Sequence, residues 1–210
     1  MLTSQPSSKR RFLRYVLALG WLPFIPAPAY SAALTPQAGT GPFYPTKGMR
    51  FQDADNDLVL IAGNVQQAGG EIVVLQGRVL DENANPVGGA RVEIWQCDMN
   101  GRYLHTGDTN ATPDPNFQGF GHVVTVEDGS YAFRTIRPVS YPGRTPHIHV
   151  KVFTPGREFT TQFYIKDHPD NRRDGLFRRM QRSQIAAVLM DFKPGGQLPT
   201  ATIDIVVDTG

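Results

Sequence analysis

The chain of 210 residues contains one cysteine, Cys97, and two tryptophans. A single cysteine cannot form an internal disulfide bond or supply the thiolates of a structural zinc site. The sequence is therefore neither a small domain stabilised by disulfide bonds nor one stabilised by zinc. The 21 glycines lack the regular spacing of a collagen-like chain. Charged residues make up 19% of a sequence that is 40% hydrophobic, which excludes a disordered chain and predicts one globular domain.

Residues 1–33 differ in composition from the rest and resemble an export signal. The segment opens with a basic stretch that contains Lys9, Arg10, Arg11 and Arg14. An apolar run at residues 15–25 and small residues up to Ala33 follow, as in a cleavable leader. The run has 11 residues, fewer than the roughly 20 that span a bilayer, so we favour a leader over a membrane anchor. We expect an exported protein, periplasmic or extracellular, whose mature domain is residues 34–210.

The route of export has two possible forms. The adjacent Arg10 and Arg11 resemble the pair of a twin-arginine signal, although the spacer residue before Phe12 is missing. An ordinary secretory signal is the alternative. A twin-arginine route exports folded proteins, which suits a domain that takes up a cofactor before export.

The leader also accounts for the positive charge of the whole chain. Four of the 21 Lys and Arg residues and none of the 19 Asp and Glu residues lie in residues 1–33, so the remainder has a formal charge of −2. The remainder therefore lacks the excess of basic residues that is typical of proteins binding nucleic acids or anionic membranes. We expect no nucleic-acid partner, and no membrane partner once the leader is removed.

Short segments of alternating polarity, rich in Val, Ile, Phe and Tyr, recur along residues 34–210. We expect β-strands at residues 71–80, 90–96, 130–136, 147–153, 158–165 and 201–207. Short strands at this spacing predict an all-β fold, an antiparallel β-sandwich with long functional loops and at most one or two short helices. Residues 174–192 could form a helical turn or another strand, and residues 42–45 and 108–119 are expected to be loops.

Two histidines, His147 and His149, begin one of the expected strands. Side chains two positions apart on a strand point to the same face, so both imidazoles share a face and Ile148 points to the other. Two neutral imidazoles on one face can form half of a metal site. A pair of exposed or hydrogen-bonded histidines is the alternative.

Tyrosines are the best candidates for the other half of such a site. Carboxylates are sparse near the histidines, which weakens an iron(II) site of two histidines and one carboxylate. Tyr141 lies six residues before His147, and Tyr103 follows a turn. Phenolate is a hard anionic ligand, so this donor set would favour a hard trivalent ion over zinc. The ion would have to lower a tyrosine pKa from about 10, which requires a strong Lewis acid.

Several motifs in this region together resemble the intradiol ring-cleavage dioxygenases. They are residues 77–81, 86–98, 101–103 and 129–136, the G-P-F-Y-P segment 41–45, and the Y-P-G-R-T-P-H-I-H block 141–149. The resemblance covers residues 36–208. It is closest to the protocatechuate 3,4-dioxygenase subunit type, because the helical N-terminal domain of catechol 1,2-dioxygenases has no room in this chain.

The resemblance implies a ligand set, an activity and a cofactor. The four protein ligands of an Fe(III) ion match Tyr103, Tyr141, His147 and His149. The implied reaction cleaves a catechol-type ring between its two hydroxyls with O2 and yields a muconate-type diacid. A homo-oligomer and a pairing with a partner subunit are both compatible with the resemblance.

Individual roles follow from the same resemblance. Tyr141 matches the tyrosine that leaves the iron when substrate binds and accepts a catechol proton. Arg144 matches an arginine that stabilises negative charge developing on the ring, and a fixed guanidinium in a dry site would do so on physical grounds as well. Gln162 matches a residue of the substrate pocket. We expect Tyr44 at the mouth of that pocket, with simple packing in its loop as the alternative.

The sequence also leaves room for other functions. The segment between Tyr141 and His147 is short and contains Gly143, so a substrate with a carboxylate is in doubt. A non-catalytic β-sandwich binding module of the transthyretin or carboxypeptidase-regulatory type, with incidental histidines and tyrosines, is the alternative function. An iron(II) extradiol enzyme is a third reading, but it needs a carboxylate ligand.

Overall fold

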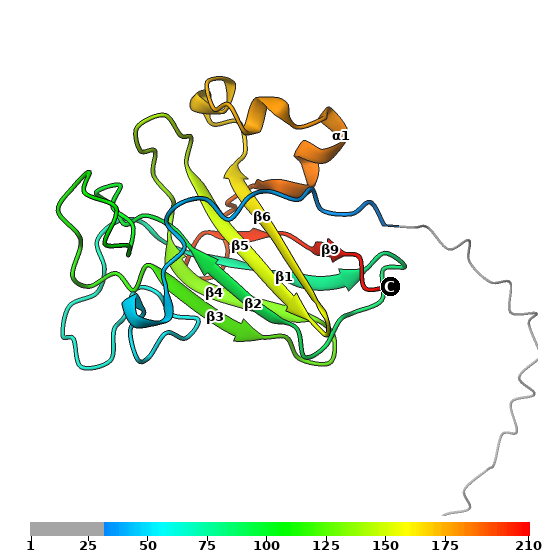
Figure 1. Cartoon of the computed structure of the whole chain (residues 1–210). Helices are drawn as coiled ribbons and strands as arrows, with labels where there is room; N and C mark the ends of the chain where they lie inside the picture. The colour runs from blue at the N-terminus through cyan, green and yellow to red at the C-terminus, as the bar shows by residue number, and fades with distance from the viewer. Residues whose placement is uncertain (1–31) are drawn as a thin grey trace, which may run out of the picture.

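The computed structural model describes residues 32–210 (Figure 1). The predicted leader, residues 1–33, lies outside the described residues except for its last two positions. None of the helices found between residues 32 and 210 combines the length and the apolar character of a membrane span.

Nine strands and five short helical segments make up the described part of the chain. The strands are β1 (Ile72–Asp81), β2 (Arg91–Trp95), β3 (Phe120–Val124), β4 (Ser130–Ile136), β5 (His147–Thr154), β6 (Arg157–Ile165), β7 (Leu189–Met190), β8 (Thr200–Thr202) and β9 (Ile205–Val207). The helical segments are α1 (Arg182–Ile185) and four 3-10 turns, η1 (Lys47–Met49), η2 (Pro169–Arg172), η3 (Phe177–Arg179) and η4 (Ala186–Val188).

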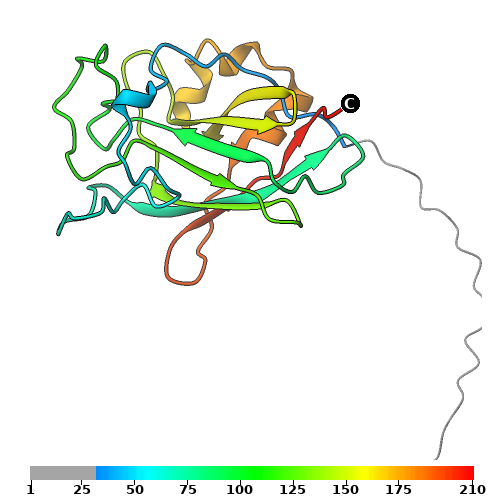
Figure 2. The same cartoon turned by 60° about the horizontal axis from the view of Figure 1, so that its bottom comes forward.

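The strands form two sheets that pack face to face, and Figure 2 shows the two layers. One sheet has the order β3-β2-β5-β6-β7, and the other has β4-β1-β8 with β9 also paired to β1. The long strands pair antiparallel, whereas the short strands β7, β8 and β9 pair in parallel with β6 and β1. The predicted β-sandwich is confirmed, with the addition that both sheets are mixed at these short strands.

The core lies between the sheets because alternate residues of each strand point inward. Leu75 and Phe133 from one sheet meet Ile94, Ile148 and Phe163 from the other, and each of these side chains is at most 1% exposed. Full burial of one such side chain contributes about 1.5–3 kcal/mol. The alternation also sends the neighbours of Ile94 and Ile148 to the opposite face of their sheet, where the site is built.

The strand at β3 was not among the six expected ones. Its sequence begins Phe-Gly-His and directly follows the long loop, so no local pattern marks it. Gly121 is required there because a Cβ would lie 2.4 Å from the Asp55 carbonyl oxygen. The expected strand at 201–207 is divided into β8 and β9, and the ambiguous residues 174–192 contain both short helical turns and the strand β7.

An N-terminal strap, residues 32–43, crosses β6 and reaches the start of β5 (blue in Figure 1). The Ala38 amide donates a hydrogen bond to the Thr160 carbonyl at 2.8 Å, and the Thr161 hydroxyl donates to the Pro36 carbonyl at 2.8 Å.

Near the end of the strap, Gly41 has a φ of +74°, and a Cβ on it would lie 3.3 Å from Cε1 of His149. A glycine therefore lets the strap approach the histidine closely.

Candidate metal centre

The two predicted histidines lie together on one face of β5, as their spacing indicates. His147 and His149 are 1% and 3% exposed. His149 lies opposite Trp95 of β2 in the sheet register. The indole and imidazole rings stack with centroids 4.7 Å apart and an interplanar angle of 9°. The sheet thus fixes the orientation of both imidazoles before any ligand binds.

The nitrogens Nε2 of both histidines face a common point. The Nδ1 atom of His147 lies 2.7 Å from the Thr145 carbonyl oxygen, so Nδ1 carries the hydrogen and Nε2 presents a lone pair. His147 Nε2 lies 3.2 Å from His149 Nε2 and 3.2 Å from the Tyr103 hydroxyl. A backbone carbonyl on the far nitrogen is the usual support of a histidine that binds a metal.

Tyr103 reaches this point from the turn that follows β2. Gly101 makes the turn with a φ of +79°, and the buried Asp98 accepts hydrogen bonds from the amides of Asn100 and Arg102. The Tyr103 amide donates to the buried Asp108 carboxylate at 2.8 Å. Two buried carboxylates therefore hold the backbone that leads into Tyr103 and the amide of Tyr103 itself, and this side chain is 3% exposed.

Tyr141 comes from the loop between β4 and β5 and closes the group. Its ring centroid lies 5.5 Å from that of Tyr103 and 5.5 Å from that of His147. The Arg144 guanidinium donates to the Tyr141 hydroxyl through Nη1 at 3.3 Å. Tyr141 is the only half-buried member of the four, since the other three are nearly inaccessible. The four side chains predicted as ligands are therefore brought together by the fold.

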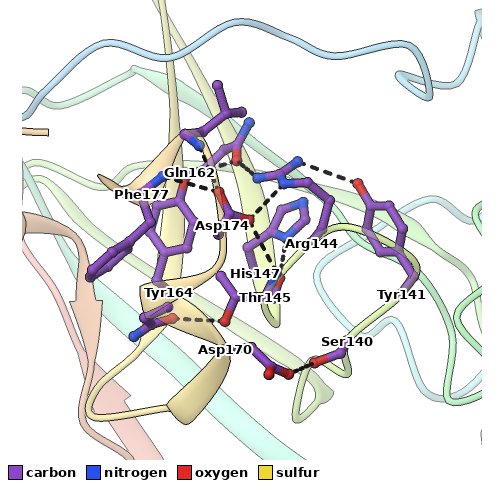
Figure 3. A network of polar contacts seen from close by, with 12 residues as sticks. Ser140, Tyr141, Arg144, Thr145, His147, Gln162, Tyr164, Asp170, Asp174 and Phe177 are labelled. Atoms are coloured by element: carbon purple, nitrogen blue, oxygen red, sulfur yellow. Dashed lines mark hydrogen bonds and ion pairs between the residues drawn. The ribbon is translucent and has the colours of Figure 1, made fainter. Parts of the chain in front are cut away.

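Arg144 is held between Tyr141, Gln162 and Asp174 (Figure 3). Its Nη2 donates to Gln162 Oε1 at 2.6 Å, and its Nε donates to Asp174 Oδ2 at 2.8 Å. The Tyr164 hydroxyl also donates to Gln162 Oε1, at 3.0 Å. Gln162, which the family resemblance matches to a residue of the substrate pocket, thus contacts the guanidinium directly.

Tyr44 lies beside the group with its hydroxyl engaged. It donates a hydrogen bond to the buried Glu93 at 2.6 Å, and its ring packs edge-on against Trp95 with centroids 4.8 Å apart. Burial, followed by the Glu93 carboxylate, raises the pKa of Tyr44 to about 12. The neighbouring Phe43 stacks on Tyr103 with ring centroids 5.1 Å apart. The G-P-F-Y-P segment therefore packs against the predicted ligands.

Burial keeps all four candidate ligands neutral in the absence of a cation. It lowers the pKa of His147 to about 4, with the nearby Arg144 charge adding to the effect, and it holds the pKa of His149 well below the usual value. Burial also raises the pKa of Tyr103 well above the usual value and raises that of Tyr141. The imidazoles offer lone pairs at neutral pH, whereas the phenols need a strong Lewis acid to lose their protons.

The donor set decides which metal these residues could hold. Between residues 32 and 210, no cluster of three or more His, Cys, Asp and Glu side chains could hold a metal ion, so tyrosine oxygens would have to complete the site. Zinc sites in proteins are built from Cys, His and carboxylate ligands. Two imidazoles and two hard phenol oxygens instead suit a hard, strongly acidic ion such as Fe(III). The residues fit that ion.

The structure adds residues that local sequence patterns did not indicate. Asp174 lies 30 positions after Arg144 and outside every motif, and Glu93 lies in the middle of β2 within the motif 86–98, where the sequence assigned it no role. Cys97 is buried in the same apolar cluster as Tyr103, and Tyr141 packs against this cluster. Burial raises its pKa to about 12, so it stays a neutral thiol. The sequence marks Asp174 only as the single acidic residue among four arginines at residues 172–179.

A separate cavity of about 420 Å³ lies beside Tyr103, between η1 and the loop before β3. Mostly apolar side chains line it, including Met49, Phe51 and Phe117. His147, His149, Tyr141 and Arg144 are not among its lining residues. The cavity therefore touches the group at Tyr103 alone.

Comparison with known proteins identifies relatives of this chain. A family model described as dioxygenase matches residues 40–209. The chain is 40% identical over 134 residues to the protocatechuate 3,4-dioxygenase beta chain of Burkholderia cepacia, covering 59% of this chain and 57% of that protein. It is 31% identical over 122 residues to catechol 1,2-dioxygenase of Candida albicans, covering 49% of this chain and 39% of that protein. The chain thus spans about half the length of these relatives.

A solved structure shares the fold over a larger part of the chain. It is the dioxygenase domain of a dioxygenase and carbohydrate-binding protein fusion from Streptomyces sp. SirexAA-E, with a TM-score of 0.64 and 31% identity. The match covers 85% of this chain and 100% of that one. Because the family match at residues 40–209 includes all four converging side chains, the chain belongs to the intradiol ring-cleavage dioxygenases.

Proposed function

We propose that this chain is a non-haem Fe(III) enzyme that cleaves a catechol-type ring between its two hydroxyls with O2. The observation that carries the proposal is the convergence of Tyr103 Oη, His147 Nε2 and His149 Nε2, at successive distances of 3.2 Å, with Tyr141 beside them. Membership of the dioxygenase family supports the same reaction class.

The iron would be held by Tyr103, Tyr141, His147 and His149. When bound, a ferric ion withdraws electron density from a chelated catecholate and makes its ring reactive toward oxygen. Burial raises the pKa of both tyrosines, so ligation would have to ionise them. The two histidines need no such change, because burial keeps them neutral at physiological pH.

Tyr141 and Arg144 would act on the substrate directly. Tyr141 is the more exposed of the two tyrosines, which suits a group that receives a proton from a catechol hydroxyl. Arg144 donates to the Tyr141 hydroxyl at 3.3 Å and would keep a fixed positive charge beside the ring of a bound substrate. A guanidinium held there would stabilise negative charge that develops on the ring in the transition state.

Gln162 and Tyr44 would shape the substrate site. Gln162 fixes one edge of the Arg144 guanidinium, and its amide nitrogen donates to the Gly39 carbonyl of the strap at 3.4 Å. Tyr44 would contribute its ring surface, because its hydroxyl is engaged by Glu93. The segment between Tyr141 and His147 is short, which favours catechols without a ring carboxylate as substrates.

The proposed cellular context rests on the leader and on the relatives. Residues 1–33 support export, by a twin-arginine or an ordinary secretory route, to the periplasm or the outside of the cell. One relative is named as a beta chain, which supports assembly with a partner subunit, and self-association is the alternative.

The test is purification of the chain with iron, followed by metal analysis, absorption spectroscopy and a substrate panel. We expect about one iron per chain, a red colour from tyrosinate-to-iron charge transfer, and oxygen uptake with catechol, protocatechuate or hydroxyquinol that yields a muconate-type product. A colourless protein without iron after reconstitution would overturn the proposal in favour of a β-sandwich binding module. Cleavage beside the hydroxyls rather than between them would also overturn it.

A further inference from the structure

The carboxylate of Asp174 is completely buried and engaged by four donors. Its Oδ2 accepts hydrogen bonds from Arg144 Nε at 2.8 Å and from the Thr145 amide at 3.1 Å. Its Oδ1 accepts from the amides of Leu176 and Phe177 at 2.8 Å and 3.0 Å. The side chain is 0% exposed, against 18% for Arg144. No motif discussed above assigns this residue a role.

We propose that Asp174 is the positioning residue that aims the Arg144 guanidinium at the reacting ring, an inference that rests on the proposed function. A guanidinium has three edges that can donate. Asp174 holds Nε and Gln162 holds Nη2, so Nη1 is left directed at Tyr141 and the candidate metal centre (Figure 3). Fixing two edges determines both the position and the plane of the third.

A carboxylate is better suited to this task than a neutral side chain. Its two oxygens each accept from two of the four surrounding N–H groups. An asparagine at the same place has only one oxygen, so its NH2 group would face two of these N–H donors. The negative charge also offsets the partly buried positive charge of Arg144. Removing one partner of such a pair leaves an uncompensated charge, so the arginine would relocate.

The segment that contains Asp174 also supports the second contact of Arg144. Phe177 packs edge-on against Tyr164, with ring centroids 5.1 Å apart and an interplanar angle of 77°. Tyr164 in turn donates to Gln162 Oε1. The amide of Phe177 binds Asp174, so one short segment supports both Arg144 contacts, one directly and one through Tyr164 and Gln162.

The first experiment measures turnover of iron-loaded variants. We expect Asp174→Asn to lower kcat by about tenfold to a hundredfold, because a misplacement of about 1 Å can cost that much. KM for the catechol should stay within about threefold. Asp174→Glu, which keeps the charge on a longer arm, should recover part of the loss. Asp170→Asn is the matched control, because Asp170 lies on the same segment and contacts Ser140 and Arg173 but not Arg144.

A double variant separates positioning from general stabilisation. In an Arg144→Gln background, Asp174→Asn should cause no further fall in kcat, because the group on which Asp174 acts is gone. An equal fall in both backgrounds would overturn the proposal, and so would a folded, iron-loaded Asp174→Asn enzyme with the kcat of the wild type.

The second experiment does not depend on activity. In the iron-free protein, the Nε–H of Arg144 should give a separate NMR signal that exchanges slowly with water and moves or disappears in Asp174→Asn. Rapid exchange in the wild type would overturn the proposal even if the variant failed to fold. A wild type without iron or oxygen uptake would instead overturn the proposed function and leave this signal as the measure of the Asp174 contact.

Discussion

At the scale of single residues, the candidate centre depends on four donors that differ in how firmly they are held. His147 is fixed by the Thr145 carbonyl, His149 by the stacked Trp95, and Tyr103 by a backbone bound to Asp108. Tyr141 is half-buried and shares its hydroxyl with Arg144. The least firmly held donor is thus the one proposed to receive a proton from the substrate.

Substitution of Tyr141 by phenylalanine tests that difference. We expect Tyr141→Phe to keep iron through the other three ligands, to change the absorption band and to lower kcat by about a hundredfold, as loss of a proton acceptor does. Absorption spectra and steady-state rates would measure both effects. Tyr131→Phe is the control, because the buried Tyr131 hydroxyl donates to the Ile203 carbonyl instead. A Tyr141→Phe enzyme with wild-type colour and rate would contradict the assignment.

Loss of a histidine should have a different result. We expect His149→Ala to reduce the bound iron at least tenfold, since it removes one of the three firmly held ligands and leaves a water-filled gap, whereas Tyr141→Phe removes the least firmly held one. Metal analysis of the purified protein after reconstitution would measure the iron per chain. His105→Ala is a suitable control, because His105 packs against Phe43 and lies outside the group of four. Full iron occupancy in His149→Ala would remove this histidine from the ligand set.

At the scale of elements, local patterns and distant contacts contributed differently. Ser130–Ile136 was predicted with its full extent, and the alternation of apolar residues explains why. The His147 and His149 pair was predicted to share a face because a period of two needs only local sequence. β3 and Asp174 were missed because each acquires its role from contacts with residues far away in the sequence.

Gly77 in β1 shows how a contact between distant parts of the chain can depend on a single residue. A Cβ at this position would lie 1.7 Å from the Ile203 carbonyl oxygen, between β8 and β9. We expect Gly77→Ala to destabilise the protein by about 3 kcal/mol or more, because the backbone must move to relieve the overlap. Gly48→Ala, where a Cβ meets nothing within 4 Å, should change the stability by less than about 1 kcal/mol. Urea unfolding of both variants is the measurement, and equal stabilities would contradict the prediction.

At the scale of the whole molecule, buried and paired carboxylates link stability to pH. Burial alone would raise the pKa of Asp174, but hydrogen bonds from the Phe177 amide, the Arg144 side chain and the Thr145 amide outweigh it and lower the pKa. A lowered pKa in the folded state means that this contribution to stability is present above the unfolded value of about 3.9. It is lost as the pH falls through the lower folded value.

The consequence is a measurable difference in acid stability. We expect the free energy of unfolding of the wild type to fall below about pH 4, and the fall to be smaller in Asp174→Asn, which has no carboxyl to protonate. Urea unfolding at several pH values between about 7 and 3 would measure both curves. Parallel curves for the two proteins would show that Asp174 does not contribute to the acid response.

The single buried cysteine has a practical consequence for attaching a label to this protein. Cys97 is 1% exposed, and burial raises the pKa of its thiol to about 12, so thiol-directed reagents have no accessible native target. A cysteine placed at Val65, which is 99% exposed, would react alone and could carry one fluorophore or one spin label. The distance from that label to a paramagnetic ion could then be measured without any background labelling.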